Sequence, residues 1–309
     1  MSADTPRIVT LLPSATEIVY TLGIEPVGVS HECDHPPEAS DKPAVNRSRV
    51  DPEASSAEIN EQVAAAEDDE GVYAIREDRL AALDPDLIVS QGICDVCAVD
   101  EVLVRDAVDR LGLDAAILTT DPHSLEDVFT DIERIGDAVG RSERAVELVA
   151  DLRERVEAVE RTVQAKVTER PRVAVLDWLD PVMVAGHWIP EMVRMAGGEY
   201  GLAEPGDRSE PREWDEITEY DPETLIAAPC GFGLSQTVEN VADLTDREGW
   251  GDLTAVRTGE AYAMDGHHYV NRPGPRLVDT LEALAGLLHP EVFGSPPPEI
   301  ARPLAEVVA

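Results

Sequence analysis

Short runs of hydrophobic residues alternate along this chain with stretches of helical character, and the arrangement occurs twice. Runs of strand length lie in the first half at residues 7–12, 27–30, 87–90 and 115–118, and in the second half at 172–176, 224–228 and 262–264. Strands that alternate with helices usually form parallel sheets. The pattern therefore predicts an α/β protein of two Rossmann-like lobes with mostly parallel sheets.

One long helix is predicted between the two copies. Residues 141–169 contain neither Pro nor Gly, and their apolar residues form one stripe at Ala145, Leu148, Val149, Leu152, Val156, Val159, Val163 and Val167. At 1.5 Å per residue this helix is about 40 Å long, enough to span both lobes. A coiled-coil partner would also suit the stripe, but the strand directly after Pro171 favours an intramolecular backbone helix.

These elements divide the chain into four predicted parts. They are an N-terminal α/β lobe (1–140), the connecting backbone helix (141–169), a C-terminal α/β lobe (170–290) and a peripheral tail (291–309). Two similar lobes that face each other form a cleft, where small molecules often bind. Near the start, Ser14-Ala15-Thr16-Glu17 predicts a capping box that opens a helix.

The charge of the chain excludes one class of partner. Lys and Arg number 25 against 63 Asp and Glu, which gives a net charge of −38. Nucleic acid binding needs a basic face, so it is not expected. Acidic residues spread along the whole chain are typical of a halophilic protein, since high salt screens their repulsion. An acidic surface that serves one basic partner is the alternative.

The compartment is predicted from the N-terminal residues and the cysteines. No apolar run approaches the ~20 residues of a membrane span, and Met1–Arg7 shows no feature of a signal peptide. We therefore expect a cytoplasmic protein without membrane insertion. In that compartment its four cysteines would stay reduced. A misassigned start would instead make the protein extracellular or membrane-associated.

Candidate ligand contacts follow the predicted strands, because ligands of open α/β sheets lie beyond the carboxyl ends of strands. These loops contain Trp178, His187, Trp188, Phe232, the adjacent His267 and His268, and all four cysteines. Aromatic side chains with a polar tip suit a large, flat, partly polar ligand. On an extended segment, His267 and His268 would point to opposite sides.

The thiols allow three interpretations. Cys94-x-x-Cys97, together with His31 and Cys33, has the ligand types of a soft-metal site. The same cysteines could form a redox pair, or they could simply pack in a loop. No nucleophile elbow, phosphate-binding loop or dinucleotide fingerprint is present. An enzyme is therefore not expected, although a thiol- or metal-dependent enzyme that uses these four residues stays an alternative.

Several short motifs occur in a characteristic order. They are Pro13–Glu17, Val27–Ser30 followed by Cys33-Asp34-His35-Pro36-Pro37, Asp84–Ile88, Cys94–Val99 and Arg272-Pro273-Gly274-Pro275-Arg276. In this order the chain resembles the cobalamin-binding proteins of ABC importers. These belong to the helical-backbone substrate-binding proteins, which also include siderophore and haem binders. The resemblance extends from about Arg7 to about His289.

The resemblance implies a ligand clamped in the cleft and a permease that docks on top of each lobe. Matching position by position places the corrinoid-facing loops at Glu32, Gln91, Trp178, His268, Tyr269 and Arg272. Glu32 and Gln91 replace aromatic residues of well-known members. The acidic docking residues fall on Asp78 and Asp215, with Glu216 close by, and such residues suit arginines on a transporter.

Together these observations predict a monomeric, non-enzymatic protein that binds a corrinoid and needs no cofactor. Trp178, Trp188, Tyr269 and Phe232 would supply apolar contacts, and His268 or His187 would approach the cobalt. Glu32, Gln91 and Arg272 would bond the amide side chains or the phosphate of the nucleotide loop. A receptor for an iron siderophore or haem is the alternative within the same fold.

Overall fold

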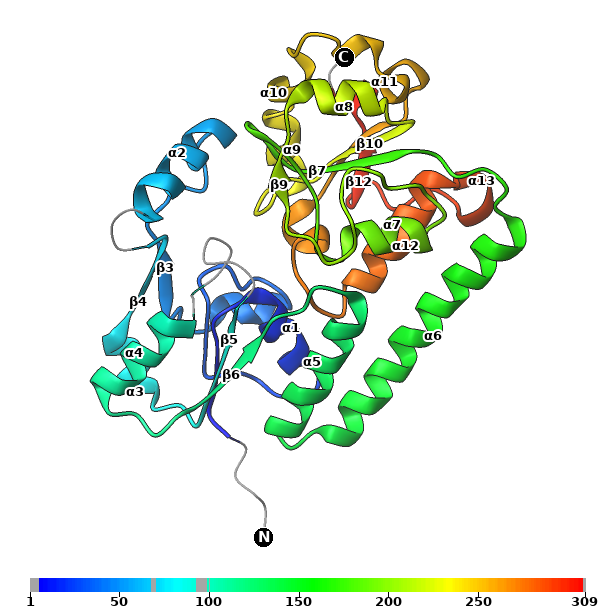
Figure 1. The fold of residues 1–309 in the computed structure, drawn as a ribbon. Helices are drawn as coiled ribbons and strands as arrows, with labels where there is room; N and C mark the ends of the chain where they lie inside the picture. Colours follow the sequence, from blue (N-terminus) through cyan, green and yellow to red (C-terminus); the bar gives the residue numbers. More distant parts are fainter. Residues whose placement is uncertain (1–5, 68–70, 93–98, 100, 308–309) are drawn as a thin grey trace. The chain divides into compact units, whose positions relative to one another are not determined.

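The structure is a computed structural model that describes residues 6–67, 71–92, 99 and 101–307. Its fold consists of two compact units (Figure 1). Unit 1 comprises residues 1–52, 61–122 and 126–150, and unit 2 comprises residues 53–60, 123–125 and 151–309. The predicted boundaries at 140, 169 and 290 stay predictions. The predicted class is confirmed, because each unit carries a sheet with parallel strands and helices between them.

Unit 1 contains a four-stranded parallel sheet with the order β2-β1-β5-β6. Its strands are β1 (Ile8–Thr10), β2 (Gly28–Val29), β5 (Leu87–Gln91) and β6 (Ala116–Thr120), and a separate antiparallel pair is formed by β3 (Asn46–Ser48) and β4 (Tyr73–Ile75). The helices of this part are α1 (Pro13–Thr21), α3 (Glu77–Leu83), α4 (Glu101–Leu111) and α5 (Leu125–Ala138), and α2 (Ser56–Glu67) joins residues of both units. Val9, Ile88, Leu80 and Val104 are fully buried in its core.

Unit 2 contains a six-stranded sheet with the order β12-β11-β10-β7-β8-β9. Its strands are β7 (Val173–Leu179), β8 (Val182–Val184), β9 (Glu210–Pro211), β10 (Thr224–Ala227), β11 (Ala261–Met264) and β12 (Ala301–Pro303). Strands β7, β10 and β11 are parallel, and the other three pair antiparallel. Residues 291–309, predicted as a peripheral tail, therefore add a strand to this sheet.

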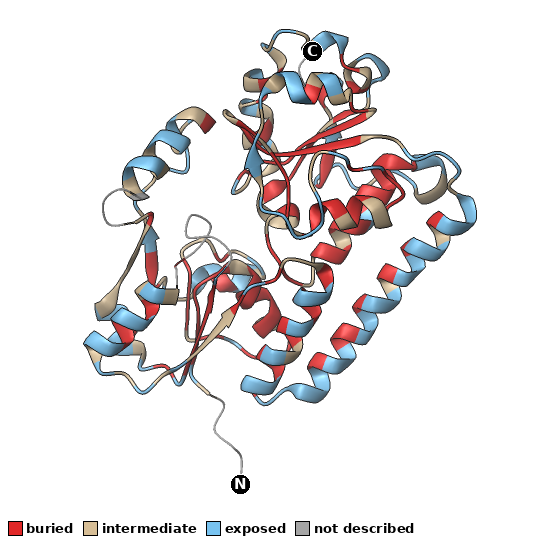
Figure 2. Cartoon of the chain, in the orientation of Figure 1, coloured by how far each residue is buried: buried red, intermediate tan, exposed pale blue. Residues whose placement is uncertain are grey.

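The helices of unit 2 lie between and beside these strands. They are α7 (Ile189–Met195), α8 (Trp214–Tyr220), α9 (Leu234–Glu239), α10 (Ala242–Thr245), α11 (Thr254–Thr258), α12 (Leu277–Leu288), α13 (Pro290–Phe293) and α14 (Leu304–Val307). Every residue of β7 and β10 is buried (Figure 2). Strands covered on both faces are mostly apolar, which is why the sequence showed continuous runs here and no alternation.

The internal repeat is visible as the same hydrogen-bonded lock in each unit. In unit 1 the guanidinium of Arg7 donates to the carbonyl oxygens of Leu83 and Asp84, and its backbone N–H donates to the carboxylate of Asp86. In unit 2 the guanidinium of Arg172 donates to the carbonyls of Tyr220 and Asp221, and its N–H donates to Glu223. In each unit these bonds, which we call the arginine lock, join the start of the first strand to the turn before the neighbouring strand, β5 in unit 1 and β10 in unit 2.

The long helix is α6 (Ser142–Lys166), as the apolar stripe predicted. Its residues up to Ala150 belong to unit 1 and the rest to unit 2. The stripe is buried as far as Val163, with Val156, Val159 and Val163 at most 8% exposed, whereas Val167 lies beyond the end of the helix and is half-buried. Within unit 2, Arg155 ties α6 to α12 through Asp279 at 2.5 Å and Glu282 at 2.7 Å.

Two local predictions are wrong. The first helix starts at Pro13, and Ser14 lies buried inside it without a side-chain cap, so no capping box forms. Proline suits this first helical position because its missing N–H would have no partner there. His267 and His268 lie in one turn of π-helix, Gly266–Val270, and not on an extended segment. Their rings consequently meet edge to face at 4.6 Å.

Candidate functional site

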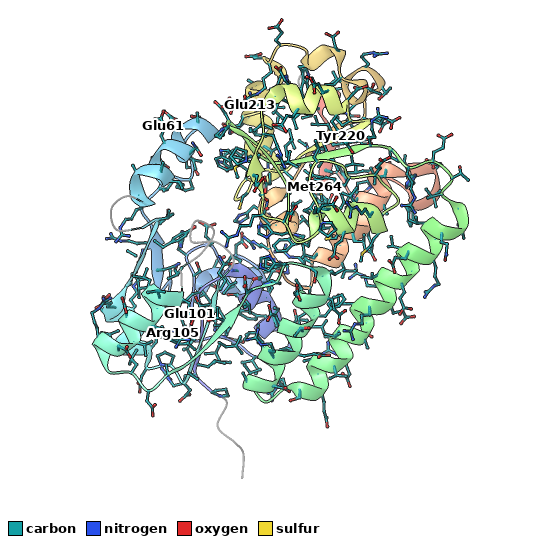
Figure 3. The ribbon with its side chains drawn as sticks, in the orientation of Figure 1. Glu61, Glu101, Arg105, Glu213, Tyr220 and Met264 are labelled. Carbon is teal, nitrogen blue, oxygen red and sulfur yellow. The ribbon has the colours of Figure 1, made fainter. Side chains whose placement is uncertain are left out.

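Most predicted ligand residues gather at the carboxyl edge of the unit 2 sheet. The parallel strands β11, β10 and β7 are neighbours there. Trp178 lies at the end of β7, Phe232 follows β10, and the segment from Asp265 to Arg272 follows β11, whose last residue, Met264, is labelled in Figure 3. We call the segment 265–272 the β11 turn.

The β11 turn is fixed against its neighbours by backbone and side-chain contacts. The backbone N–H of His267 donates to the carbonyl of Phe232 at 2.9 Å, and the Asn271 side chain donates to the carbonyl of Ala228 at 3.3 Å. The indole N–H of Trp188 donates to the carbonyl of Val270 at 3.0 Å. These bonds come from the loop after β10 and from the start of α7, so the turn is held from two sides.

His268 is paired with a carboxylate inside this turn. Asp265 accepts a hydrogen bond from the backbone N–H of His268 at 2.8 Å, and its other carboxylate oxygen lies 2.8 Å from Nδ1 of the same residue. The Asp265 side chain is 11% exposed, and that of His268 is 35% exposed. The carboxylate therefore lies in the interior, while the imidazole ring reaches the surface.

Arg272 and Tyr269 also lie on the β11 turn, in different surroundings. Arg272 is 4% exposed, and its guanidinium contacts Nε2 of His267. Since a guanidinium only donates hydrogen bonds, His267 must accept at Nε2. Tyr269 lies under the guanidinium of Arg276, 5.5 Å from the ring centre. Burial raises the pKa of Tyr269, so its hydroxyl stays protonated at neutral pH.

The aromatic candidates pack closely and are largely covered. Trp178 and Phe232 lie 5.2 Å apart in a tilted pair and are 9% and 2% exposed. Trp188 is 5% exposed, and its ring contacts that of His187 at 5.5 Å. His187 has a left-handed backbone, with φ of 52°, and also faces His123 at 5.7 Å. Two of these residues also bond the β11 turn, through the carbonyl of Phe232 and the indole of Trp188.

Asp177 is a residue that the sequence did not single out. It lies inside β7 at a bulge opposite β8, and one oxygen of its buried carboxylate accepts no hydrogen bond from the described residues. Burial raises its pKa to about 6, although a hydrogen bond from Ser209 opposes this effect. The available signal was an acidic residue inside the apolar run Val173–Leu179.

Unit 1 places two further predicted ligand contacts at the carboxyl ends of its strands. Gln91 is the last residue of β5 and is 5% exposed, and Glu32 follows β2. Glu32 lies 3.1 Å from Nε2 of His31, whose Nδ1 faces the side chain of Asn46 at 3.1 Å. The roles of Gln91 and Glu32 stay predictions.

Of the four residues in the predicted thiol cluster, the structure describes His31 and Cys33. Cys33 is buried, and its sulfur lies 2.9 Å from the hydroxyl of Thr16. Cys230 is a free thiol of intermediate exposure after β10. Cys94 and Cys97 lie outside the described residues. The choice between a metal site, a redox pair and packing therefore stays open.

The predicted docking acids occupy matching positions in the two units. Asp78 and Asp215 are each the second residue of a seven-residue helix, α3 and α8 respectively. Both helices are followed by an aspartate with a left-handed backbone, Asp84 with φ of 40° and Asp221 with φ of 46°. Asp78, Asp215 and the neighbouring Glu216 are exposed. The repeat thus presents an acidic first turn in each unit.

The two acidic turns are supported by different contacts. In α3, Glu77 pairs with Arg110 at 2.6 Å. In α8, which begins after Glu213 and ends at Tyr220 in Figure 3, the ring of Trp214 stacks on Trp250 at 6.3 Å. The guanidinium of Arg247 lies over Trp214, 5.6 Å from the ring centre.

The fold agrees with the comparison to known families. The family model described as periplasmic binding protein matches residues 8–267. The chain belongs to the periplasmic binding protein family. A substrate-binding lipoprotein of an ABC transporter from Bacillus subtilis, YvrC, is 24% identical over 295 residues, which are 93% of this chain and 81% of that protein. A cobalamin-binding protein of Halobacterium salinarum is 25% identical over 295 residues, 94% of this chain and 71% of the relative.

Solved structures of the same fold bind different ligands. The vitamin B12-binding protein BtuF of Vibrio cholerae superposes with a TM-score of 0.65 at 20% identity, covering 92% of this chain and 96% of its own. The haem-binding protein RhuT of Roseiflexus, in its apo form, gives a TM-score of 0.69 at 23% identity, covering 92% and 98%. These similarities confirm the fold and leave the ligand undecided.

The comparisons confirm the predicted resemblance and correct the predicted location. The family is that of substrate-binding proteins of ABC importers, which work together with a permease on a small-molecule ligand. The cytoplasmic location is contradicted, because the matched family is periplasmic and the Bacillus relative is a lipoprotein. Among the helices that the structure describes, none has the length and apolar character needed to cross a membrane.

Proposed function

We propose that this protein captures a corrinoid outside the cytoplasmic membrane and delivers it to an ABC permease. The observation that carries the proposal is the β11 turn, where a partly exposed imidazole, a tyrosine and a buried arginine are held together at the carboxyl edge of three parallel strands. The relatives named cobalamin-binding and vitamin B12-binding support the same ligand class.

The chemistry of a corrinoid suits these residues. Its broad ring needs apolar surface, which we propose that Tyr269 offers, with the largely buried Trp178, Trp188 and Phe232 packed nearby. Its amide side chains and phosphate need hydrogen bonds, and Arg272 donates charge-assisted ones. Glu32 and Gln91 are proposed to bond the amides. All of these are binding interactions, so we propose that the protein is not an enzyme and needs no cofactor.

Haem or an iron siderophore is the second candidate ligand. An anionic ferric chelate is held best by several cations, and the β11 turn carries Arg272 with Arg276 beside it. The solved haem-binding structures share this fold. The amide-rich corrinoid makes fewer demands on positive charge, and in a chain with a net charge of −38 it is the better match.

The ligand can be tested by gel filtration of the purified protein with cyanocobalamin. We expect the corrin absorbance to elute with the protein, and Arg272→Ala to weaken binding about 10- to 100-fold through loss of a charged hydrogen bond. Arg302→Ala is the matched control, since Arg302 is exposed on β12 and bonds only the Pro298 carbonyl among the described residues. Elution of all cobalamin at the free-ligand volume would reject the proposal.

We also propose that the acidic turns of α3 and α8 contact arginines of the permease. Cells that depend on this protein for cobalamin uptake should lose most uptake with Asp78→Arg or Asp215→Arg, because the reversed charge repels the partner. Cobalamin binding by the purified variants should not change. The control is Glu219→Arg, which alters the charge equally on an exposed site of α8. Unchanged uptake with both substitutions would contradict docking at these turns.

A further inference from the structure

We infer that Arg247 is a positioning residue that connects the acidic turn of α8 to the candidate ligand site. Its contacts join Trp214 on α8 to Asp180 and Trp178 beside that site, and we call these four residues the Arg247 link. All of them belong to unit 2. The inference rests on the proposed function for the roles of α8 and Trp178, and it adds a physical connection between docking and ligand binding.

Arg247 bridges two segments that lie far apart in the sequence. Its Nε donates to the carbonyl of Asp243 on α10 at 2.7 Å. Its Nη2 donates to the carbonyl of Leu179, the last residue of β7, at 3.0 Å and to the carboxylate of Asp180 at 3.2 Å. The Arg247 side chain is 25% exposed, so water competes little for these bonds. The guanidinium therefore fixes the turn between β7 and β8.

This turn is bonded in its own right to the candidate ligand site. The indole N–H of Trp178 donates to the carbonyl of Asp180 at 3.1 Å, so Asp180 is held from two sides. The ring of Trp178 packs on Phe232 at 5.2 Å. The carbonyl of Phe232 accepts the backbone N–H of His267, on the β11 turn, at 2.9 Å. A shift of Asp180 therefore reaches Trp178 first and the β11 turn after it.

The other end of the Arg247 link is the first residue of α8. The guanidinium carbon of Arg247 lies 5.6 Å from the ring centre of Trp214, a distance at which an indole face attracts a cation. The indole N–H of Trp214 donates to the carbonyl of Glu248, the residue after Arg247, at 2.9 Å. Asp215, the proposed docking acid, directly follows Trp214. A partner bound at this turn therefore acts on Trp214 and, through it, on Arg247.

Unit 1 shows that an acidic turn does not require this aromatic contact. The corresponding helix, α3, begins with Glu77 in place of Trp214, and Glu77 pairs with Arg110 on α4 at 2.6 Å. The Arg247 link is thus an addition to the repeated motif, in the unit that carries the β11 turn.

Arginine suits this place because its planar group presents five donors in a fixed fork. One face can lie over an indole while the edge bonds carbonyl and carboxylate oxygens. A lysine ammonium is a point charge on a flexible stem and does not hold both contacts together. Because coupling between two binding sites is reciprocal, a partner at α8 and a ligand near Trp178 change each other's affinity by the same factor.

The first test needs no ligand. The chain has four tryptophans, so protein labelled with 5-fluorotryptophan can be followed by fluorine NMR, with each resonance assigned by substitution to Phe. Arg247→Gln should shift the resonances of both Trp214 and Trp178. Arg172→Gln is the matched control, because Arg172 also bonds two carbonyls and a carboxylate but precedes the opposite end of β7. An unshifted Trp178 in Arg247→Gln overturns the inference.

Asp180→Asn tests the link from its other end and keeps it testable if Arg247→Gln does not fold. The Asp180 side chain is 49% exposed, so the amide should be tolerated. Weakening its bond to Arg247 should shift the resonance of Trp214, although the substitution lies in the turn after β7. The double variant should shift Trp214 no further than Arg247→Gln alone, because residues that act together are not additive. An unshifted Trp214 in Asp180→Asn likewise overturns the inference.

The second test measures cyanocobalamin binding by calorimetric titration. Arg247→Gln should weaken binding about 2- to 30-fold, the range for residues that modulate a site without touching its ligand. Arg172→Gln should have less than about a 2-fold effect. Equal weakening by the two substitutions would show a general structural role and overturn the inference.

The two tests separate the inference from the proposed function. If the wild-type protein binds no cyanocobalamin, corrinoid binding is rejected. The fluorine shifts of Trp178 and Trp214 then decide the Arg247 link by themselves, since they are measured on the free protein. If cyanocobalamin binds and Trp178 does not shift in Arg247→Gln, the link is rejected and corrinoid binding stands.

Discussion

At the scale of single residues, the buried carboxylate of Asp177 makes stability depend on pH. Its pKa rises to about 6 from the ordinary 3.8 because burial disfavours the charged form. The folded protein therefore binds this proton more tightly than the unfolded chain does. The stabilisation is complete below about pH 4 and is lost as the pH rises through about 6.

We therefore predict that Asp177→Asn stabilises the protein at neutral pH. The shift of about two pKa units corresponds to about 3 kcal/mol, and the amide keeps an acceptor for Ser209. Urea unfolding of both proteins between pH 4 and 8 would measure this effect. The two free energies of unfolding should diverge as the pH rises, and parallel curves would show that Asp177 is charged at little cost.

The hydrogen bond of Trp188 gives a second prediction at this scale. Trp188→Phe keeps most of the ring but leaves the carbonyl of Val270 without the indole donor. Loss of a buried partner costs about 1–3 kcal/mol. Urea unfolding should show that loss, with Trp214→Phe as a control in which the freed carbonyl of exposed Glu248 can bond water. Equal effects of both substitutions would contradict a special role for Trp188.

Sequence reasoning identified residue types better than residue environments. It placed Phe232 and His268 correctly after strand ends, because strand ends follow from the apolar runs, whereas Trp178 lies within the last residues of β7. It did not find Asp265 as the partner of His268, because it placed the segment in an extended conformation, in which residues three apart point to opposite sides. Asp177 was missed because β7 continues to Leu179, beyond the run at 172–176.

At the scale of elements, the two units repeat one arrangement. An arginine at the start of the first strand hydrogen-bonds the turn that precedes the neighbouring strand. The Arg7 lock and the Arg172 lock use the same donor atoms, and their acceptors lie in equivalent turns. The sequence signalled this through the repeated Pro-Arg and Asp-Pro pairs. The helix boundaries were less accessible, since the start of α1 is decided by proline geometry and not by the side chains that resembled a capping box.

Close packing of the β11 turn on the loop after β10 can be tested with glycine substitutions. A Cβ on Gly266 would lie 2.6 Å from the carbonyl oxygen of Ala228 and closer still to that of Pro229. Because both atoms belong to the backbone, Gly266→Ala should cost at least about 2 kcal/mol. Gly233→Ala is the matched control, since nothing lies within 4 Å of its Cβ position. Similar melting temperatures for the two variants would contradict the packing.

At the scale of the whole molecule, the charge of −38 makes stability depend on salt. Raising NaCl from 0.1 to about 3 M shortens the screening length from about 10 Å to less than 3 Å. We expect the melting temperature to rise on the order of 10 °C or more. Sucrose at matched osmolality is the control, because it favours burial without screening charge. A melting temperature independent of NaCl would contradict the predicted halophilic character.

The class of fold could be predicted from the sequence, and the cellular location could not. The apolar runs of strand length and the apolar stripe of the long helix mark the residues that become buried. Burial depends on residue type, so the sequence encodes it directly. Location was inferred from the first seven residues, and the family match corrected it. The ligand lies between these cases, because similar proteins of this one fold are named for binding cobalamin or haem.

The central claim is that this protein binds a corrinoid, and calorimetric titration at high salt tests it most directly. Cyanocobalamin and ferric haem should be titrated separately into the same protein. The proposal predicts one cyanocobalamin per chain with a Kd of about 1 μM or lower, near −8 kcal/mol, and much weaker binding of haem. Saturable binding of haem with no binding of cyanocobalamin would contradict it.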